Sequence, residues 1–450
     1  MIIIIILIFT LLLLFSKILL KNELSKKMLN IYLIWWGLLL VISTTNPFGI
    51  YPVSEKIYFM LIISIFMFTF GFFFNNLSNK TKTYNLNKHD VISEILGGFE
   101  KVSKSKLVFI FMILLIILLF RYNWIYQQKV LIFGTEDTRN MRFYVGDVFK
   151  STIEIYFYTF FIEAISIFVS LYLSFSLAWN RFNRISWLSV VYVYLYSSFG
   201  AGRLYLIELG FYIIFFYIIK KLLLNIKENF DSKEVKELNK SNRKVLAVLI
   251  PVFFLLYSFS IYLSNFRRGR FDLTYENFKE GNTIFLEQIV IYCVGSFRAL
   301  EYGIKIYSDT IGNTFGRISF GGLDEIFGVL ITGLGGNYEY ANLIYGKKTA
   351  TEINIGLDQT YNALFTNIFG LYLDFGMLGV VCISFLWGFL FSKIIFYFQN
   401  KTNFYSICVV VFTSVVIMLT VLKWKMQSPS AWIFIIGAII LSQNRKLVKY

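Results

Sequence analysis

The sequence predicts an all-α, polytopic membrane protein with about 11 transmembrane helices and a large outer loop containing short interfacial helices. Of its 450 residues, 57% are hydrophobic and 20% are aromatic. The apolar residues form long runs, and a bilayer-spanning helix needs about 20 such residues. A soluble chain of this length could not bury so much apolar surface. We therefore predict one integral membrane domain over residues 1–450, which includes an extracytoplasmic loop over 264–360.

The apolar runs give the candidate spans in chain order. The first run lacks a positively charged start and a small-residue cleavage site, so we expect a retained helix and not a signal peptide. The sequence shows no internal repeat. Eleven candidate spans lie near residues 2–20, 29–44, 57–76, 106–120, 151–177, 185–200, 204–219, 245–263, 375–397, 404–422 and 430–442.

Basic residues orient these spans, because Lys and Arg concentrate in cytoplasmic loops. The loop 220–244 holds eight basic residues and the loop 78–105 holds five. The turn 180–184 and the C-terminal tail are basic as well. Eleven helices with the N-terminus outside place all these segments in the cytoplasm. The same parity places 121–150 and 264–360 outside, and it predicts a multi-pass membrane protein with a cytoplasmic C-terminus.

The remaining composition excludes several classes of function. The net charge of +16 sits mostly in short loops between helices. There it sets topology and meets anionic lipid, so we predict membrane lipid and not nucleic acid as its partner. Three scattered cysteines give neither a disulfide framework nor metal-ligand spacing. The one histidine, His89, lies in a Lys-rich loop. We expect no metal and no cofactor.

Arginines are numerous on the predicted outer face. Arginine has a permanent charge and a planar fork of donors, which suits phosphate and carboxylate oxygens. The alternative is that they are solvated loop charges or lipid-headgroup anchors. As a cluster they predict an anion site, because several lie at helix ends and beside glycines: Arg121, Arg139, Arg142, Arg203, Arg267, Arg268, Arg270, Arg298 and Arg317.

Arg203 follows a Gly-Ala-Gly turn between two apolar helices, where backbone can approach a ligand closely. Glu208 lies five residues later, about 7 Å deeper along a helix. An ionisable residue inside a membrane helix is a candidate functional residue. The alternative is a structural ion pair between Arg203 and either Glu208 or Glu163.

Two apolar stretches interrupt the outer loop, at 283–297 and 323–335. Each is short for a span, so we expect interfacial or re-entrant helices that cover a cavity at the membrane surface. Arg298 and Glu301 follow the first at helical spacing. Asp324 and Glu325 open the second, where helix capping is the alternative to a functional role.

The stretch TYNALFTNIFGLYLDFGMLGVV, at 360–381, places polar residues on an apolar background. Asp374 stands where the ninth helix is expected to begin. A carboxylate there is ordinary capping, or it binds sugar hydroxyls or accepts a proton. The polar residues before it are Tyr361, Asn362, Thr366 and Asn367.

Three features together resemble the Wzy family of oligosaccharide repeat unit polymerases, also called O-antigen or capsule polymerases. They are GAGR before a helix, an arginine-rich start to the long outer loop, and an N-x-x-x-T…Y-x-D-F-G-x-x-G pattern. The pattern residues are Asn362, Thr366, Tyr372, Asp374, Phe375, Gly376 and Gly379. The likeness covers most of the chain in layout and about forty positions in residues.

The resemblance implies a membrane glycosyltransferase, a polysaccharide polymerase. It would transfer a growing glycan from undecaprenyl diphosphate onto a lipid-linked oligosaccharide repeat unit at the outer face of the bacterial cytoplasmic (inner) membrane, without a metal. A chain-length regulator and a flippase are implied partners. The base would be one of Glu208, Glu301, Asp324, Glu325 and Asp374. We predict catalytic roles for Arg203, Arg270, Glu208 and Asp374, and diphosphate or sugar binding by Arg267, Arg268, Arg298, Arg317, Arg142, Tyr361, Asn362 and Thr366.

Two other functions stay open at this point. A flippase or transporter of lipid-linked oligosaccharide would also need many helices and arginines in a cavity. Such folds often carry internal repeats and little mass outside the membrane, unlike this sequence. A ligase-like glycosyltransferase is the other alternative. A related ligase family is associated with an outer histidine, which is absent from the predicted outer segments.

Overall fold

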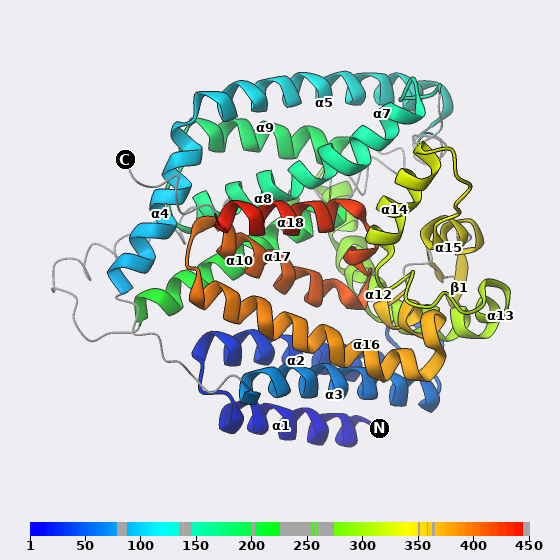
Figure 1. The fold of residues 1–450 in the computed structure, drawn as a ribbon. Coiled ribbons are helices and arrows are strands. Elements are labelled where there is room, and N and C mark those ends of the chain that lie inside the picture. The colour runs from blue at the N-terminus through cyan, green and yellow to red at the C-terminus, as the bar shows by residue number, and fades with distance from the viewer. Residues whose placement is uncertain are drawn as a thin grey trace. The chain divides into compact units, whose positions relative to one another are not determined.

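The computed structural model describes residues 1–78, 88–134, 138, 146–199, 203–225, 254, 257–258, 261, 274–349, 352–357, 359–361 and 365–443. In this part of the chain nearly every element is a helix, so the all-α class is confirmed (Figure 1). The helices are α1 (Ile2–Leu19), α2 (Glu23–Ser43), α3 (Glu55–Ser78), α4 (Lys88–Lys104), α5 (Lys106–Phe133), α7 (Thr152–Phe157), α8 (Glu163–Ala178), α9 (Arg184–Ser198), α10 (Arg203–Asn225), α12 (Tyr275–Ile306), α13 (Ser308–Ile311), α14 (Gly321–Gly333), α15 (Ala341–Thr349), α16 (Asn367–Asn400), α17 (Phe404–Met418) and α18 (Pro429–Gln443).

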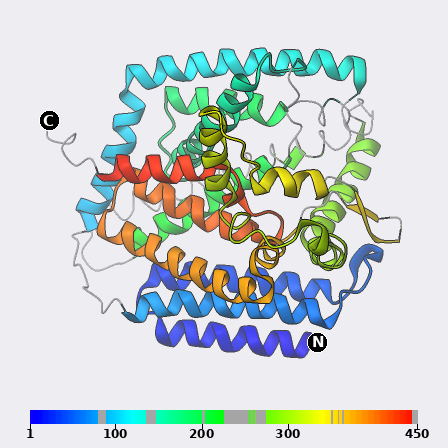
Figure 2. The ribbon, with the colours of Figure 1, turned by 45° about the vertical axis from the view of Figure 1, so that its right-hand side comes forward.

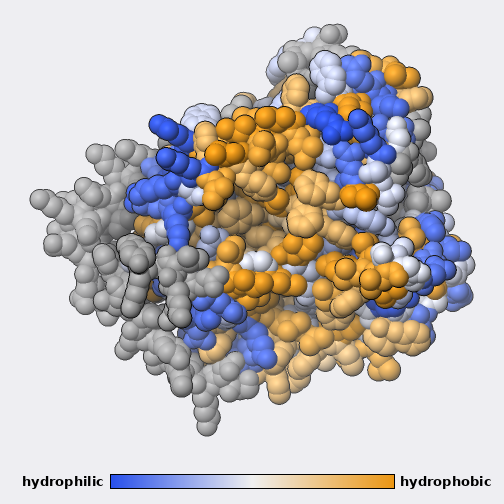
Figure 3. Space-filling view, turned by 45° about the horizontal axis from the view of Figure 1, so that its top comes forward, coloured by the Kyte–Doolittle hydropathy of each residue, from blue (hydrophilic) through white to orange (hydrophobic). Residues whose placement is uncertain are grey.

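The chain is a membrane protein by the length and composition of its helices. Eight helical segments of the described chain are long and apolar enough to cross a bilayer. In α1 and in α5, only 22% of the apolar 18-residue stretch that could span a bilayer is buried. Most of their side chains therefore face outward, as lipid-facing side chains do. Hydrophobic side chains occupy much of the surface seen in Figure 3.

Helices occupy every predicted span that the structure describes. The exception is the run at 245–263, which lies largely outside the described residues. Polar side chains define several of the helix starts. Asn22 caps α2 by accepting the backbone N–H of Ser25 at 3.0 Å, and Asn183 and Ser186 form a capping box at the start of α9.

The predicted short helix at 283–297 is longer than expected. It belongs to α12, which runs for 32 residues and is long enough to cross a membrane. The expected length was wrong because hydropathy marks only the apolar part of a helix. The polar turns at both ends contain Glu276, Lys279 and Glu280 before the apolar run and Glu301 after it, and these are good helix formers. The other predicted short helix, at 323–335, corresponds to α14, and its interfacial position stays a prediction.

The chain divides into two compact units, each discontinuous in sequence. Unit 1 comprises Met1–Asn85, Leu286–Asn400 and Val416–Trp432. Unit 2 comprises Leu86–Phe285, Lys401–Val415 and Ile433–Tyr450. The prediction of one integral membrane domain stays a prediction.

Unit 1 is built on α1, α2, α3 and α16, which lie alongside one another in both views (Figures 1 and 2). Helices α3 and α16 run parallel and touch through small residues. A Cβ on Gly71 would lie 2.0 Å from the carbonyl oxygen of Phe385, and one on Gly388 would lie 1.9 Å from that of Phe68. The hydroxyls of Ser64 and Ser384 hydrogen-bond at 2.8 Å. Such contacts let two membrane helices approach closely.

A small hairpin in unit 1 is the described chain's only sheet. Strands β1 (Ile353–Gly356) and β2 (Gln359–Tyr361) pair antiparallel, with Ile353 opposite Tyr361. The hairpin joins the segment before α3, because Tyr51 donates its backbone N–H to Ile355 at 2.9 Å. It therefore lies at the end of unit 1 where α3 begins.

Unit 2 contains α4, α5, α8, α9 and α10, with the first part of α17 and most of α18. Residues 152–178 form one span whose middle, Tyr158–Ile162, is a π-helical turn. The Tyr192 hydroxyl donates to the carbonyl oxygen of Ile162 at 3.1 Å. A π-helical turn widens a helix locally and is often found at functional positions.

Candidate functional site

The sequence pattern Y-x-D-F-G-x-x-G forms a break in α16. Phe375 (φ −149°, ψ 27°) and Gly376 (φ 60°, ψ −143°) leave the helical conformation. The backbone angles of Gly376 favour glycine, since a side chain there would be strained. At Gly379 a Cβ would lie 2.1 Å from the carbonyl oxygen of Leu371. The structure thus explains both glycines of the pattern. Gly376 allows the break in the helix, and Gly379 allows the backbone to pass close to the carbonyl oxygen of Leu371.

The break frees backbone carbonyls, and the turn at 314–319 pairs with them. The backbone N–H of Thr314 donates to Leu373 at 3.0 Å, and that of Phe315 donates to Asp374 at 3.2 Å. Phe315 and Gly316 have positive φ angles of 52° and 87°, which bend the chain into the break. A broken membrane helix is tolerated when neighbouring groups satisfy its backbone in this way.

The Asp374 side chain ties this turn to the helix. It is fully buried, and its carboxylate accepts four hydrogen bonds. The Thr314 hydroxyl lies at 2.6 Å, the Ile318 N–H at 3.1 Å and the Ser319 N–H at 2.8 Å, and the Ser319 hydroxyl also donates. Several donors to one buried carboxylate make a strong anchor. The predicted helix start at Asp374 was wrong, because a helical segment precedes the break from Asn367 onward.

Arg317 projects from the anchored turn and is held in a fixed orientation. Its Nε donates to Asp324 at 3.0 Å and its Nη2 donates to the carbonyl oxygen of Glu339 at 2.5 Å. The guanidinium carbon lies 4.9 Å from the centroid of the Tyr338 ring, within range of a cation–π contact. The side chain remains 35% exposed. Arg317 therefore presents a permanent, oriented positive charge with part of its donor fork accessible.

Asp324 is the hub of this cluster, although the sequence suggested helix capping as its alternative role. It also accepts the hydroxyl of Tyr338 and the backbone N–H of Ala341, the latter at 2.7 Å. Burial and the hydrogen bond to Asp324 raise the pKa of Tyr338 above its usual value. Tyr338 therefore keeps its proton, and with it this hydrogen bond, throughout the neutral range. The Arg317–Asp324–Tyr338 cluster is thus held in place by contacts within the protein.

Arg298 and Glu301 form a second charged pair in unit 1. Their Nη1 and Oε2 atoms lie 2.5 Å apart, and the guanidinium lies over Tyr51 at 5.9 Å. Glu301 also accepts the backbone N–H of Ser54 at 3.4 Å. The Nε of Arg298 is buried without a hydrogen-bond partner in the described chain. Buried donors without acceptors are uncommon, so this atom marks a place where an acceptor would bind favourably.

The two other described residues of the predicted binding set are enclosed. Tyr361 is buried in the hairpin and donates its hydroxyl to the carbonyl oxygen of Tyr292 at 2.9 Å. Thr366 is buried just before α16, and its hydroxyl has no hydrogen-bond partner in the part of the chain that the structure describes. Both side chains are therefore buried, and neither is exposed beside Arg317.

A small polar cavity lies between α2, α3, α16 and residues after α17. Its volume is about 20 Å³, enough for a single water molecule. Asn367, Ser384 and Thr420 line it, together with Trp36 and Trp387. The indole N–H groups of both tryptophans are buried and lack partners among the described residues. A bound water or hydroxyl would satisfy them.

In unit 2, Glu208 is buried in α10 and Glu163 follows the π-helical turn. Each has an interaction partner in the structure. Between them lies a tyrosine cluster, in which the rings of Tyr196 and Tyr205 lie 4.6 Å apart. The Tyr205 hydroxyl hydrogen-bonds Ser170 at 2.5 Å. The backbone of Arg203 begins α10, as the sequence predicted.

Several predicted site residues lie outside the described residues: Arg142, Arg267, Arg268, Arg270 and Asn362. Of the others, the structure brings Arg317 and Asp374 together through one turn. It also places Arg298, Tyr361 and Thr366 in unit 1, whereas Arg203 and Glu208 belong to unit 2. The roles predicted for them stay predictions.

Sequence reasoning missed the partners of Arg317 and Asp374. Thr314 and Ser319 lie 60 and 55 residues before Asp374, and nothing local in the sequence links them. Tyr338 lies 14 residues after Asp324. One available signal was the TFGRISFGG stretch at 314–322, where glycines around an arginine indicate a tight turn.

Among the described residues, no group of three or more His, Cys, Asp or Glu side chains is arranged to hold a metal ion. Comparison with known proteins adds no family: no family model, no curated protein and no solved structure matches the chain.

Proposed function

We propose that this protein is a membrane polysaccharide polymerase, a lipid-dependent glycosyltransferase. It would move a growing glycan from undecaprenyl diphosphate onto a lipid-linked oligosaccharide repeat unit at the outer face of a bacterial cytoplasmic membrane. The observation that carries the proposal is Arg317, a partly exposed and oriented cation on a turn that Asp374 locks into the break of α16. This break is formed by the same residues that resemble the polymerase family.

The proposed chemistry needs a fixed positive charge. The acceptor hydroxyl oxygen would bond to the anomeric carbon of the donor sugar, the bond from that carbon to the diphosphate oxygen would break, and the hydroxyl proton would pass to a base. Negative charge then grows on the leaving diphosphate. Preorganised donors aimed at developing charge are among the largest contributions to catalysis. Arg317 is preorganised by Asp324, Glu339 and Tyr338.

A second observation supports anion binding in unit 1. The Nε of Arg298 is a buried donor without a partner in the described chain, and Tyr51 and Glu301 hold its guanidinium. The other arginines predicted from sequence to bind or stabilise the diphosphate stay separate candidates: Arg203, Arg267, Arg268, Arg270 and Arg142. Asp374 is disfavoured as the base, because it already accepts hydrogen bonds on both of its oxygens. Glu208, Glu301, Asp324 and Glu325 stay candidates.

The first test compares Arg317→Ala and Arg317→Lys with Lys348→Ala. Lys348 is an exposed cation on α15 and serves as the matched control. Each variant is expressed in a strain from which this gene is deleted, and polymer is measured on gels against protein level. We expect Arg317→Ala to lower polymer yield about 10²–10³-fold, the usual effect of losing one charge-stabilising donor. Arg317→Lys should restore only part, because lysine lacks the donor fork.

The deletion strain itself separates polymerase from transporter. Single repeat units on lipid or at the surface, without a ladder, are expected for a polymerase. Lipid-linked units confined to the cytoplasmic side would instead identify a flippase. Full-length polymer from Arg317→Ala at the wild-type yield would show that the diphosphate site lies elsewhere. Arg203→Ala and Arg270→Ala, assayed in the same strain, would then test the other predicted arginines.

A further inference from the structure

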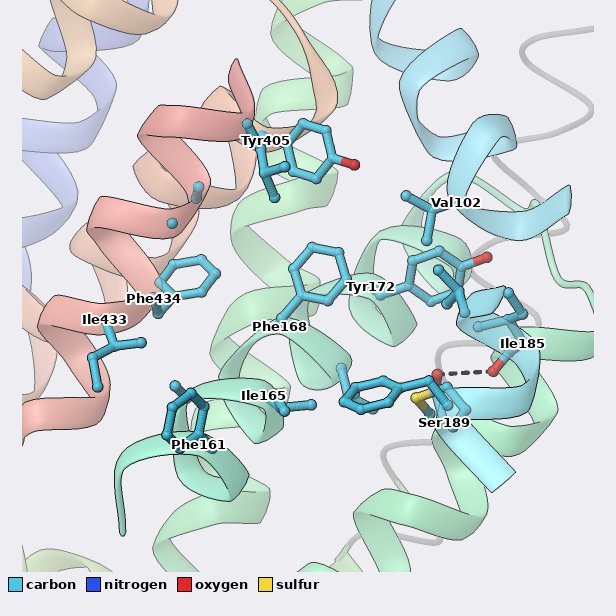
Figure 4. Close-up of a pocket in the computed structure, with 18 residues that line it drawn as sticks. Val102, Phe161, Ile165, Phe168, Tyr172, Ile185, Ser189, Tyr405, Ile433 and Phe434 are labelled. Atoms are coloured by element: carbon cyan, nitrogen blue, oxygen red, sulfur yellow. Dashed lines mark hydrogen bonds between the residues drawn. The ribbon is translucent and has the colours of Figure 1, made fainter. Parts of the chain in front are cut away.

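Unit 2 contains an apolar cavity that the proposed reaction does not use. Its volume is about 330 Å³, and residues of α4, α5, α8, α9, α17 and α18 line it (Figure 4). The rings of Phe161, Phe168 and Phe434 are among the side chains around it. This volume is at the lower end of the range for ligand pockets, roughly 300–1,000 Å³. Protein interiors are otherwise close-packed, so a hollow of this size favours an occupant.

The cavity lining offers mainly hydrocarbon contacts. Ser189 donates its hydroxyl to the carbonyl oxygen of Ile185 at 2.8 Å, the dashed line in Figure 4. The Tyr172 hydroxyl exchanges hydrogen bonds with Asn183 at 2.9 and 3.1 Å. These polar groups are therefore engaged within the protein. A ligand that fits this lining is an aliphatic chain, because a polar ligand would lose its hydrogen bonds to water.

Positive charge gathers at one end of the cavity. Val102 and Val108, on either side of the α4–α5 junction, line it, as does the first turn of α9. Glu100 is the one acid within 100–106 and 180–186, where five exposed bases occur: Lys101, Lys104, Lys106, Arg181 and Arg184. The hydrogen bond from Lys104, and further away the charge of Arg181, hold the pKa of Glu100 below its usual value. The two basic segments are thus close in space.

Aromatic residues mark the same end as a membrane interface. Phe182 and Trp187 are 40% and 65% exposed, and their rings meet edge-on with centroids 4.9 Å apart. Exposed aromatic rings beside basic residues are typical of helices at the headgroup level. An aliphatic chain in the cavity would therefore continue into a headgroup beside the basic segments.

We infer that unit 2 binds an anionic phospholipid, with one acyl chain in this cavity and the phosphate beside Lys106 and Arg184. The charge complementarity selects an anionic headgroup over a zwitterionic one. A phospholipid fits better than a polyprenyl diphosphate, because the predicted topology places 78–105 and 180–184 on the cytoplasmic side. That leaflet carries anionic lipid, and the proposed transfer takes place at the opposite face. The choice of a phospholipid over a polyprenyl diphosphate rests on the proposed function, whereas the binding of an anionic lipid rests on the cavity and the basic segments alone.

The test uses purified protein with phosphatidylglycerol or phosphatidylcholine of identical chains, and native mass spectrometry to measure bound lipid. Gly437 lines the cavity, and a Cβ there would meet nothing within 4 Å, so Gly437→Leu is chosen to fill the cavity. Gly97, in α4, has equally open space and does not line the cavity, so Gly97→Leu is its matched control. For the charges, Lys106→Gln with Arg184→Gln is compared with Lys150→Gln, which lies beyond the other end of α5.

We expect phosphatidylglycerol to be retained over phosphatidylcholine by the wild-type protein. Gly437→Leu and the double charge variant should each reduce that retention about tenfold or more, while both controls retain it. Equal retention of the two lipids, or unchanged retention by Gly437→Leu, would overturn the inference. Displacement of phosphatidylglycerol by an equimolar polyprenyl diphosphate would assign the cavity to the glycan carrier instead.

A photoactivatable acyl chain on phosphatidylglycerol provides a second readout on the wild-type protein, which is needed if Gly437→Leu does not fold. Crosslinks are expected within 161–172 and 433–441, the segments that contribute Phe161, Tyr172, Phe434 and Leu441 to the cavity. Crosslinks spread over α1 and the outward side of α5 would show ordinary lipid contact only, and would contradict a defined site.

Discussion

At the residue scale, Asp374 and Arg317 have different roles in one turn: Asp374 fixes the backbone, and Arg317 presents the positive charge. Asp374 contacts the backbone N–H groups of Ile318 and Ser319, which directly follow Arg317. Arg317 is then oriented by Asp324, which lies one turn into α14. A buried carboxylate with donors on both oxygens is suited to positioning and not to accepting a further proton. The acid of the family-like pattern is thus best understood as a positioning residue for the arginine.

This division predicts the effect of Asp374→Asn. The amide keeps one acceptor oxygen but turns an NH₂ group toward two of the present donors. Leaving a buried donor unpaired costs about 1–3 kcal/mol, so with two such donors we expect the free energy of unfolding to fall by about 2–6 kcal/mol. Denaturant unfolding in detergent measures this change, and tryptic cleavage after Arg317 reports local opening of the turn.

The control is Asp309→Asn, an exposed acid on α13 that should leave stability unchanged. If Asp374 were instead the catalytic base, Asp374→Asn would abolish polymer while stability and cleavage at Arg317 stayed at wild-type values. That combination of results would support the catalytic role that the sequence predicted for Asp374.

At the scale of elements, hydropathy predicted where helices form but not how they meet. The apolar runs located α1, α3, α5 and α17 because lipid-facing and buried side chains must both be apolar in a membrane. The break in α16 was not predicted, since its stabilising contacts come from Thr314 to Ser319, far away in the sequence. Likewise the pairing of α3 with α16 depends on Gly71 and Gly388, which hydropathy treats as neutral.

The α3–α16 contact makes Gly388→Ala a sensitive variant. Its Cβ would lie 1.9 Å from the carbonyl oxygen of Phe68, so the two helices would have to separate. Overpacking of this kind typically costs about 1–3 kcal/mol. Gly437→Ala is the matched control, because it is also a helical glycine in an apolar run but faces open space. It should be neutral or stabilising by up to about 1 kcal/mol. Thermal unfolding of both purified variants measures the difference, and equal melting temperatures would disprove the close contact.

At the scale of the whole molecule, the length of α12 raises the question of whether it crosses the membrane. Its second half stays at one end of unit 1. Arg298 lies over Tyr51, Glu301 accepts the N–H of Ser54, and Gly303 packs against Phe365. These partners precede α3 and α16, and so belong to the end where both helices begin. The contacts place the second half of α12 at that end, and the surface position predicted from sequence stays a prediction.

This position predicts the sidedness of the segment after α12. Asp309→Cys should react with a membrane-impermeant maleimide in intact cells, because the predicted topology places 264–360 outside. Lys21→Cys should react only after permeabilisation. Lys21 lies before α2, whose opposite end meets the start of α3 through the Ser43–Tyr58 hydrogen bond of 2.9 Å. Labelling of the native cysteines by the maleimide should be low, since Cys293 and Cys408 are buried and Cys382 lies within the candidate membrane span of α16.

Protection of Asp309→Cys in intact cells would mean that the end of unit 1 where α3 and α16 begin faces the cytoplasm, opposite to the predicted topology. Arg317 and the break of α16 would then face the cytoplasm, and transfer at the outer face could not use them. Labelling of both cysteines in intact cells would instead contradict the orientation of α2. Only labelling of Asp309→Cys alone places Arg317 on the side where the proposed polymer is made, so this measurement decides whether the arginine cluster and the proposed reaction share a face of the membrane.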